Sequence, residues 1–122
     1  MKISIKKTEK NFAFVASNEE TSMKLNAGSK LEEGNIGFRP METVLVAVGT
    51  CMAIDIMQIL LKQRQQVDDF EMSIEGYRKS GGTSSPFTAL TIHLHIAGKI
   101  NEDKLQKAID LSKDKYLSLI HI

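Results

Sequence analysis

The sequence is poor in the features that mark many specialised classes of protein. Its 122 residues include no tryptophan, two prolines and one cysteine, Cys51. A single cysteine excludes an intrachain disulfide framework and a cysteine-based metal cluster, and it suits a reducing compartment. Sixteen basic residues stand against fifteen acidic ones, which gives a net charge of +1. This balance argues against nucleic acid or an anionic membrane surface as the main partner.

Long apolar runs are also scarce. Residues 1–10 alternate isoleucine with lysine and lack the apolar core of a secretory signal, so we expect a cytoplasmic protein. Only residues 43–61 could suggest a membrane span, and Asp55 and Gln58 interrupt them. An aspartate near the centre of a bilayer costs about 2.5–3.5 kcal/mol. We therefore expect a buried helix, no membrane contact, and one soluble domain over residues 1–122.

The hydrophobic period predicts an α+β fold. Residues 2–8 and 11–17 alternate apolar with polar side chains and predict an N-terminal β hairpin. The polar segment 18–40 indicates a loop with one short strand at 23–25. Pro40 fits the first turn of a helix that is apolar almost all round, which predicts a central, buried helix.

Strand patterns return after this helix. Residues 70–75 and 90–97 alternate again and predict two longer strands joined by the Ser/Gly-rich segment 79–86. Asn101 is a natural N-cap, and helical spacing follows it to about Leu117. The order is therefore hairpin, central helix, two strands and second helix.

Cys51 lies in the middle of the apolar helix. Free cysteine usually acts as a small buried hydrophobe, so periodicity alone favours an inert residue. Three neighbours weaken that interpretation: Gly49 permits close approach, Thr50 offers a hydroxyl, and Asp55 lies one turn on. The aspartate itself opposes reactivity, because a carboxylate disfavours a neighbouring thiolate, which needs a positive partner instead.

Arg39 and Glu42 lie at the start of the same helix. On spacing alone they are solvated residues or an exposed pair. The nine positions from Glu42 to Cys51 rise about 13–14 Å, which exceeds hydrogen-bond reach. Either the helix is broken or starts late, with Gly49 as the candidate bend, or charged groups reach the thiol from another element or another subunit.

Other motifs carry less chemistry. His93 and His95 share one face of a strand, but no third ligand is evident, so we expect exposed residues and no metal site. The sequence has no phosphate-cradling glycine motif and no assignable Ser/His/Asp triad. We predict no cofactor.

The segment 37–55 resembles the cysteine-bearing helix of the OsmC/Ohr family, in which Pro and Glu open a helix and a cysteine follows eleven residues after the Pro. Pro40 and Cys51 keep that spacing, and the resemblance continues to Tyr116. It implies an intertwined α+β homodimer with its cysteine sites near the subunit interface. It also implies thiol-dependent reduction of organic hydroperoxides, in which a sulfenic acid forms and a second cysteine condenses with it. In the family that it resembles, an Arg lowers the pKa of the thiol and a Glu positions that Arg.

The sequence departs from the family pattern in three places. Leu117 stands where the resolving cysteine is expected, so an external thiol is needed. The acid is Glu42 rather than the residue directly after Pro40, about 100° further around the helix. Residues 1–38 contain no arginine, so Arg39 or a lysine must substitute for the family's N-terminal Arg. The chain also stops where the family continues into a final strand, which predicts a missing or altered C-terminal strand.

Two functions remain open, and a structural relative without activity is a third possibility. The first is a peroxidase for a small hydrophobic hydroperoxide, with Cys51 as the peroxidatic thiol and Glu42 and Arg39 in support. The alternative is a non-enzymatic dimer that binds a hydrophobic small molecule, with Cys51 only lining the cleft. A cation within reach of Cys51 favours the enzyme, and Asp55 alone favours the binding protein. The expected partners are a second copy of the chain, an apolar ligand and an external thiol reductant.

Overall fold

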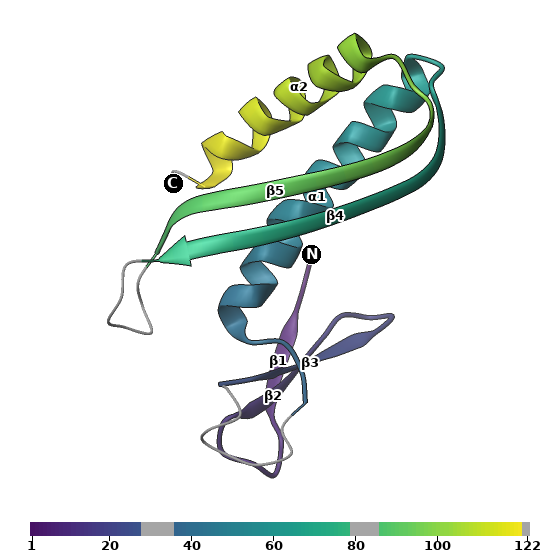
Figure 1. Cartoon of the computed structure of the whole chain (residues 1–122). Coiled ribbons are helices and arrows are strands. Elements are labelled where there is room, and N and C mark those ends of the chain that lie inside the picture. Colours follow the sequence, from purple (N-terminus) through teal and green to yellow (C-terminus); the bar gives the residue numbers. More distant parts are fainter. Residues whose placement is uncertain (28–35, 79–85, 121–122) are drawn as a thin grey trace. The chain divides into compact units, whose positions relative to one another are not determined.

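The computed structural model describes residues 1–27, 36–78 and 86–120. The elements are β1 (Ser4–Lys7), β2 (Ala13–Ser17), β3 (Ser22–Asn26), α1 (Pro40–Lys62), β4 (Gln66–Arg78), β5 (Phe87–Lys99) and α2 (Glu102–Ile120) (Figure 1). The predicted α+β class and element order are confirmed. The chain forms two compact units, Met1–Val44 and Leu45–Ile122. The predicted linker lies, except for Pro86, outside the described residues.

The first unit is a three-stranded antiparallel sheet in the order β1-β2-β3. The predicted hairpin is β1 and β2, and the short strand expected at 23–25 is β3, in which Leu25 pairs with Phe14. At Gly37 the chain returns to run beside β3. The position requires glycine, because its φ is +150° and a Cβ there would overlap the carbonyl of Lys24. Phe38 then donates a 2.9 Å backbone hydrogen bond to that same carbonyl.

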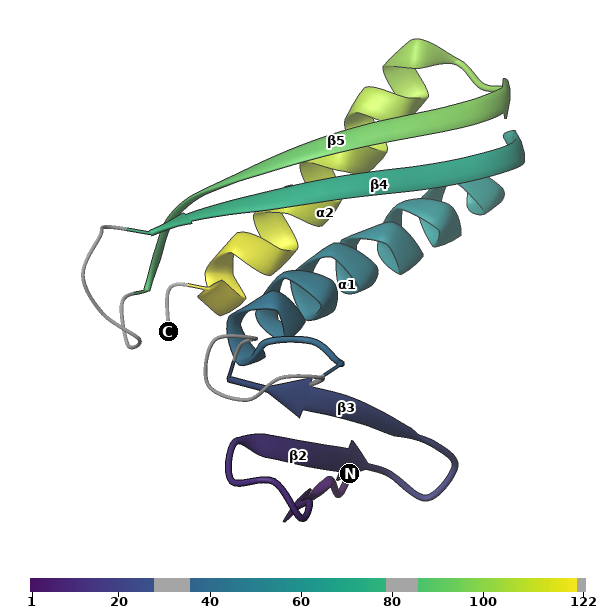
Figure 2. The same cartoon turned by 60° about the horizontal axis from the view of Figure 1, so that its bottom comes forward.

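The second unit places two helices on a long β hairpin. β4 and β5 pair antiparallel over their whole length, and α1 and α2 lie side by side on one face of the hairpin (Figures 1 and 2). Side chains alternate as predicted: inward residues such as Met72 and Leu94 are half-buried, whereas outward residues such as Glu71 and His95 are exposed. The core consists of the fully buried Ile56, Leu60 and Ala108, with partly buried neighbours on all four elements.

Both helices begin at capping residues. The backbone N–H groups of Asp103 and Lys104 donate to Asn101 Oδ1, so the predicted N-cap of α2 is confirmed. At α1, the backbone N–H of Arg39 donates a 2.8 Å hydrogen bond to Glu42 Oε1, and Pro40 occupies the first helical position. This is the carboxylate half of a capping box.

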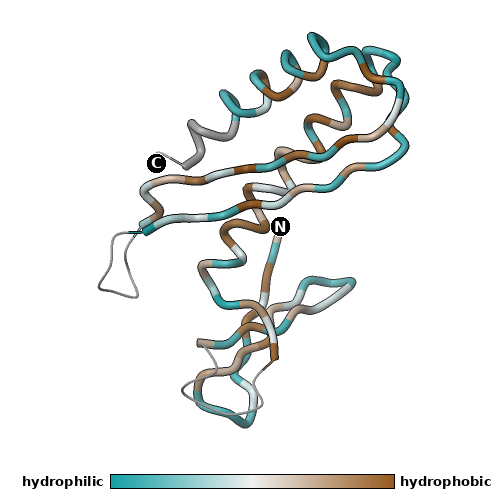
Figure 3. The backbone as a smooth tube through the Cα atoms, in the orientation of Figure 1, coloured by the Kyte–Doolittle hydropathy of each residue, from teal (hydrophilic) through white to brown (hydrophobic). Residues whose placement is uncertain are grey.

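The prediction that α1 is buried all round is wrong. Its buried residues, Gly49, Met52, Ile56 and Leu60, form a single stripe. A two-stranded sheet and one neighbouring helix cover only one side of a helix, so apolar residues elsewhere on α1, such as Val46, Ile54 and Leu61, stay exposed within the chain. Figure 3, which colours the backbone by hydropathy, shows hydrophobic residues along α1. By length and composition α1 could span a membrane, a test that core helices also pass, and 22% of its apolar window is buried.

Candidate functional site

Cys51 is exposed on α1, and it is not buried as the central-helix prediction required. It lies about 145° around the helix from the middle of the buried stripe, by the helical angle of 100° per residue. Ala47, Ile54 and Leu61 share this side of α1 and are exposed, Ile54 by 56% and Leu61 by 59%. We call these four residues the exposed α1 stripe. The thiol is thus accessible in the single chain and has apolar neighbours, Ala47 and Ile54, one turn away on each side.

A cation lies close to this turn of α1. Nζ of Lys115, on α2, is 3.3 Å from Oδ1 of Asp55, and Asp55 follows Cys51 by one helical turn. The Asp55 side chain is 13% exposed, whereas that of Lys115 is 61% exposed. The arrangement therefore supplies a positive charge beside the one acidic neighbour that opposes thiolate formation.

The packing of α2 on α1 positions this pair. Ser112 is fully buried, and its hydroxyl donates a 3.4 Å hydrogen bond to the carbonyl of Met52, the residue after Cys51. Lys115 follows Ser112 by three residues and so lies on the same side of α2. Sequence reasoning missed Lys115, because 60 residues separate it from Asp55. The signal that could have drawn attention to it is helical spacing, since Lys115 follows the buried Ser112 by three residues.

Arg39 and Glu42 are not brought to Cys51 along α1. The helix runs unbroken from Pro40 to Lys62, so the alternative of a bend at Gly49 is wrong. A straight helix keeps Glu42 and Cys51 about 13–14 Å apart along its axis. Gly49 instead permits close packing, since a Cβ there would lie 3.2 Å from Sδ of Met72 on β4. The remaining alternative, charged groups from another element or another subunit, stays open.

An apolar groove runs between α1 and β4 within the second unit. Its volume is about 310 Å³, and its lining residues are Leu45, Val46, Gly49, Thr50, Ala53, Phe70, Met72 and Ile74. Cys51 is not among them. The groove and the exposed thiol therefore lie on different sides of α1 in the single chain.

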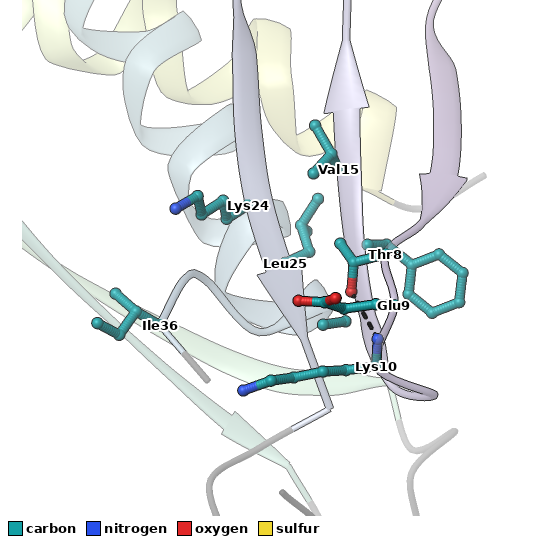
Figure 4. A pocket seen from close by; sticks show the side chains of 9 residues that line it. Thr8, Glu9, Lys10, Val15, Lys24, Leu25 and Ile36 are labelled. Carbon is teal, nitrogen blue, oxygen red and sulfur yellow. Dashed lines mark hydrogen bonds between the residues drawn. The ribbon is translucent and has the colours of Figure 1, made fainter. Parts of the chain in front are cut away.

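A second hollow, of about 210 Å³, lies in the first unit (Figure 4). Its lining residues include Glu9, Lys10 and Lys24, and Thr8 Oγ1 accepts a 3.2 Å hydrogen bond from the backbone of Lys10. None of the three predicted site residues lines this hollow. It offers charged groups beside apolar side chains and no nucleophile of the predicted kind.

His93 and His95 lie on the exposed outer face of β5. Across the ladder, His95 pairs with Glu71 and His93 with Ser73. Within residues 1–27, 36–78 and 86–120, no group of three or more His, Cys, Asp or Glu side chains is placed to hold a metal ion.

Comparison with known proteins assigns the family. The family model of OsmC-like proteins matches residues 32–116. The chain belongs to the OsmC-like protein family. This OsmC-like chain is 38% identical over 93 residues to protein YhfA of Escherichia coli K12, an alignment that covers 73% of the chain and 69% of YhfA. The matched segment 32–116 contains Arg39, Glu42, Cys51, Asp55 and Lys115.

Solved structures show the same fold. A hypothetical protein from Aquifex aeolicus VF5 superposes with a TM-score of 0.81 at 26% identity, over 98% of this OsmC-like chain and 83% of its own. An OsmC-like protein from Mycoplasma pneumoniae superposes with a TM-score of 0.72 at 16% identity, over 88% and 84% of the two chains. The architecture expected from the resemblance is confirmed for one chain, and the intertwined dimer stays a prediction.

Proposed function

We propose that this OsmC-like protein is a thiol-dependent peroxidase that reduces organic hydroperoxides through Cys51. The observation that supports it most is the exposed thiol on α1 with the ammonium group of Lys115 held beside the next turn. Sequence reasoning set a nearby cation as the feature that favours the enzyme over a simple binding protein. Lys115, on an element other than α1, places a cation against Asp55, the acidic neighbour that would favour the binding protein.

The chemistry balances with one cysteine and an external thiol. The Cys51 thiolate attacks the terminal oxygen of the hydroperoxide, the S–O bond forms, and the O–O bond breaks. The alkoxide takes a proton and leaves as an alcohol, while sulfur is oxidised by two electrons to sulfenic acid. A first external thiol condenses with the sulfenic acid and releases water. A second thiol then attacks the mixed disulfide, which frees Cys51 and a disulfide of the reductant.

A second copy of the chain completes the proposed site. Ala47 and Ile54 make the exposed α1 stripe apolar next to Cys51, with the exposed Gln58 between Ile54 and Leu61, and exposed apolar surface is typical of an interaction site. In a homodimer with α1 packed against α1, the second copy would cover the stripe. Arg39 and Glu42 of that copy are the charged groups proposed to serve Cys51, which one unbroken helix does not allow within a chain. Ala47 and Ile54 would contact the alkyl part of a small hydrophobic hydroperoxide.

Oxidation of Cys51 by a stoichiometric hydroperoxide tests this function. We expect cumene hydroperoxide to add one oxygen to the wild-type chain, in a form that a sulfenic-acid trap captures. With excess dithiothreitol, peroxide consumption should become catalytic and should be faster than with hydrogen peroxide. Cys51→Ser is the inactive control. Peroxide consumption that is equal in Cys51→Ser and wild type, with no trapped sulfenic acid, would remove the enzyme proposal.

The alternative function, binding of a hydrophobic small molecule without catalysis, is favoured by one observation. The groove of about 310 Å³ between α1 and β4 is apolar, and Cys51 does not line it. If binding is the function, an apolar ligand should bind Cys51→Ser as tightly as wild type, and Ala53→Trp in the groove should abolish binding. Isothermal titration of the two variants measures this.

A further inference from the structure

We propose that Lys115 is a positioning residue for the Cys51 chemistry: by pairing with Asp55 it cancels the carboxylate charge that would otherwise suppress the thiolate. The inference rests on the peroxidase function proposed above and names a residue that the sequence pattern did not. It is carried by an ion pair between two helices at the turn that follows the nucleophile.

The position of Lys115 is fixed by the core. Ala108 and Ser112 are both fully buried on the side of α2 that faces α1. The hydroxyl of Ser112 contacts the carbonyl of Met52, so the two helices are in register at the turn that carries Cys51. The ammonium group of Lys115 meets Asp55 from this anchored helix, although its own side chain is 61% exposed. The backbone of α2 is therefore held in place by the core, and only the side chain of Lys115 can change its conformation.

The electrostatic consequence follows from the positions of the charges on α1. Residues one turn apart on a helix have Cβ atoms about 5–6 Å apart, so Asp55 and Cys51 are neighbours on the surface of α1. The Asp55 side chain is 13% exposed, so water screens its charge less than that of a surface residue. Unpaired, it would disfavour a second negative charge on the sulfur. Paired with Lys115, it contributes almost no net charge at that distance.

Two substitutions break the same ion pair with opposite electrostatic effects. Lys115→Met leaves Asp55 unpaired beside the sulfur, so the thiolate should be rarer. Asp55→Asn removes the carboxylate and keeps the Lys115 ammonium near the turn of α1 that follows Cys51, so the thiolate should be commoner. If the pair served only the stability of the fold, both variants would lose the same contact and would change Cys51 reactivity in the same direction or not at all.

The measurement is the second-order rate constant for alkylation of Cys51 by iodoacetamide, an uncharged reagent, at pH 7 and low ionic strength. We expect Lys115→Met to react about three to ten times more slowly than wild type and Asp55→Asn about three times faster. Absorbance at 240 nm should show the same order of thiolate content. Lys115→Arg should restore the wild-type rate, and 0.5 M salt should reduce the differences.

Lys113→Met is the matched control, because Lys113 is exposed on the same helix and its loss changes the net charge equally. Its rate should equal that of wild type. Rates that move together in Lys115→Met and Asp55→Asn, or that stay unchanged in both, would overturn the inference. Alkylation needs no peroxide, so the two proposals fail separately. Opposite rate changes without trapped sulfenic acid would remove the peroxidase alone, and catalysis with equal alkylation rates would remove the role of Lys115 alone.

Discussion

The carboxylate of Glu42 accepts a 2.8 Å hydrogen bond from the backbone N–H of Arg39, at the first turn of α1. In this chain Glu42 therefore has a structural contact of its own, independent of any role at a thiol. A capping contact needs a side-chain acceptor, whereas orienting an arginine guanidinium needs a negative charge. The two roles can be separated by substitution.

Glu42→Gln should separate them. The amide keeps an oxygen acceptor for the Arg39 N–H, so the midpoint of thermal unfolding should stay near that of wild type. Peroxidase activity should fall at least tenfold if the charge of Glu42 positions Arg39 at the thiol of the second copy. Glu42→Ala should lower both the midpoint of thermal unfolding and the peroxidase activity, with a loss of about 1 kcal/mol in the free energy of unfolding. Wild-type activity in Glu42→Gln would leave Glu42 as a helix cap only.

Ile54→Glu should prevent the proposed homodimer. The variant places a charge in the exposed α1 stripe, where desolvation on assembly is costly. Light scattering at micromolar concentration should give the 13.6 kDa mass of one chain for Ile54→Glu and twice that mass for wild type. Thr91→Glu, on the exposed outer face of β5, is the control and should remain dimeric. A wild-type protein with the mass of one chain would contradict the dimer.

Two glycines should respond differently to alanine. A Cβ at Gly76 would overlap the ring of Phe87. The guanidinium of Arg78 lies over the same ring, 5.8 Å from its centroid. Gly76→Ala should therefore lower the free energy of unfolding by about 1–3 kcal/mol. A Cβ at Gly49 would meet Met72 Sδ at 3.2 Å, the flexible part of a side chain. Helix propensity favours Ala by about 1 kcal/mol, so Gly49→Ala should stay within about 1 kcal/mol of wild type in urea unfolding.

Tyr77 should lose its phenol proton at a higher pH than an ordinary tyrosine. Its phenol donates a 2.7 Å hydrogen bond to Glu75 Oε2, and this bond, with the charge of Glu75, raises the pKa of Tyr77 from its ordinary value of 10.0. The folded state favours the neutral phenol. Any contribution to stability is therefore present below the unfolded pKa and is lost as the pH rises through the folded pKa. Absorbance at 295 nm, measured in Tyr116→Phe so that one phenol remains, follows the titration.

In that background, Glu75→Ala should move the titration midpoint down toward 10.0. Glu71→Ala removes another exposed carboxylate from the same outer face of β4 and should leave the midpoint in place. An equal shift in the two variants would show that general charge, and not the hydrogen bond from Tyr77, sets the value.

The sequence was sufficient for the order of elements, because periods of two and of 3.6 residues depend on local geometry alone. Asn101 was found by its residue type and place, and the structure confirms its capping contacts. The burial of α1 could not be predicted in the same way. The apolar composition of a helix predicts that its surface is shielded from water, but not which element covers it. Cys51 was therefore predicted to lie in a core that the single chain does not form.

The candidate site was less predictable, because its charges come from distant parts of the chain. Lys115 meets Asp55 only when α2 packs on α1, and no spacing rule connects residues 60 positions apart. The cap made by Glu42 was not predicted, although its signal is local in the sequence. Proline at the first helical position with an acid two residues later is typical of a helix start, and the contact with Arg39 needed no tertiary structure.

The single exposed cysteine also bears on how long the proposed enzyme would stay active. Each copy of these 122 residues has one thiol and no second sulfhydryl with which its sulfenic acid could close a ring. In the proposed peroxidase the oxidised sulfur would therefore depend on a thiol from another molecule, and further peroxide would compete with that thiol and drive the sulfur toward sulfinic acid. The ratio of thiol to peroxide in the medium would then set the number of turnovers before inactivation.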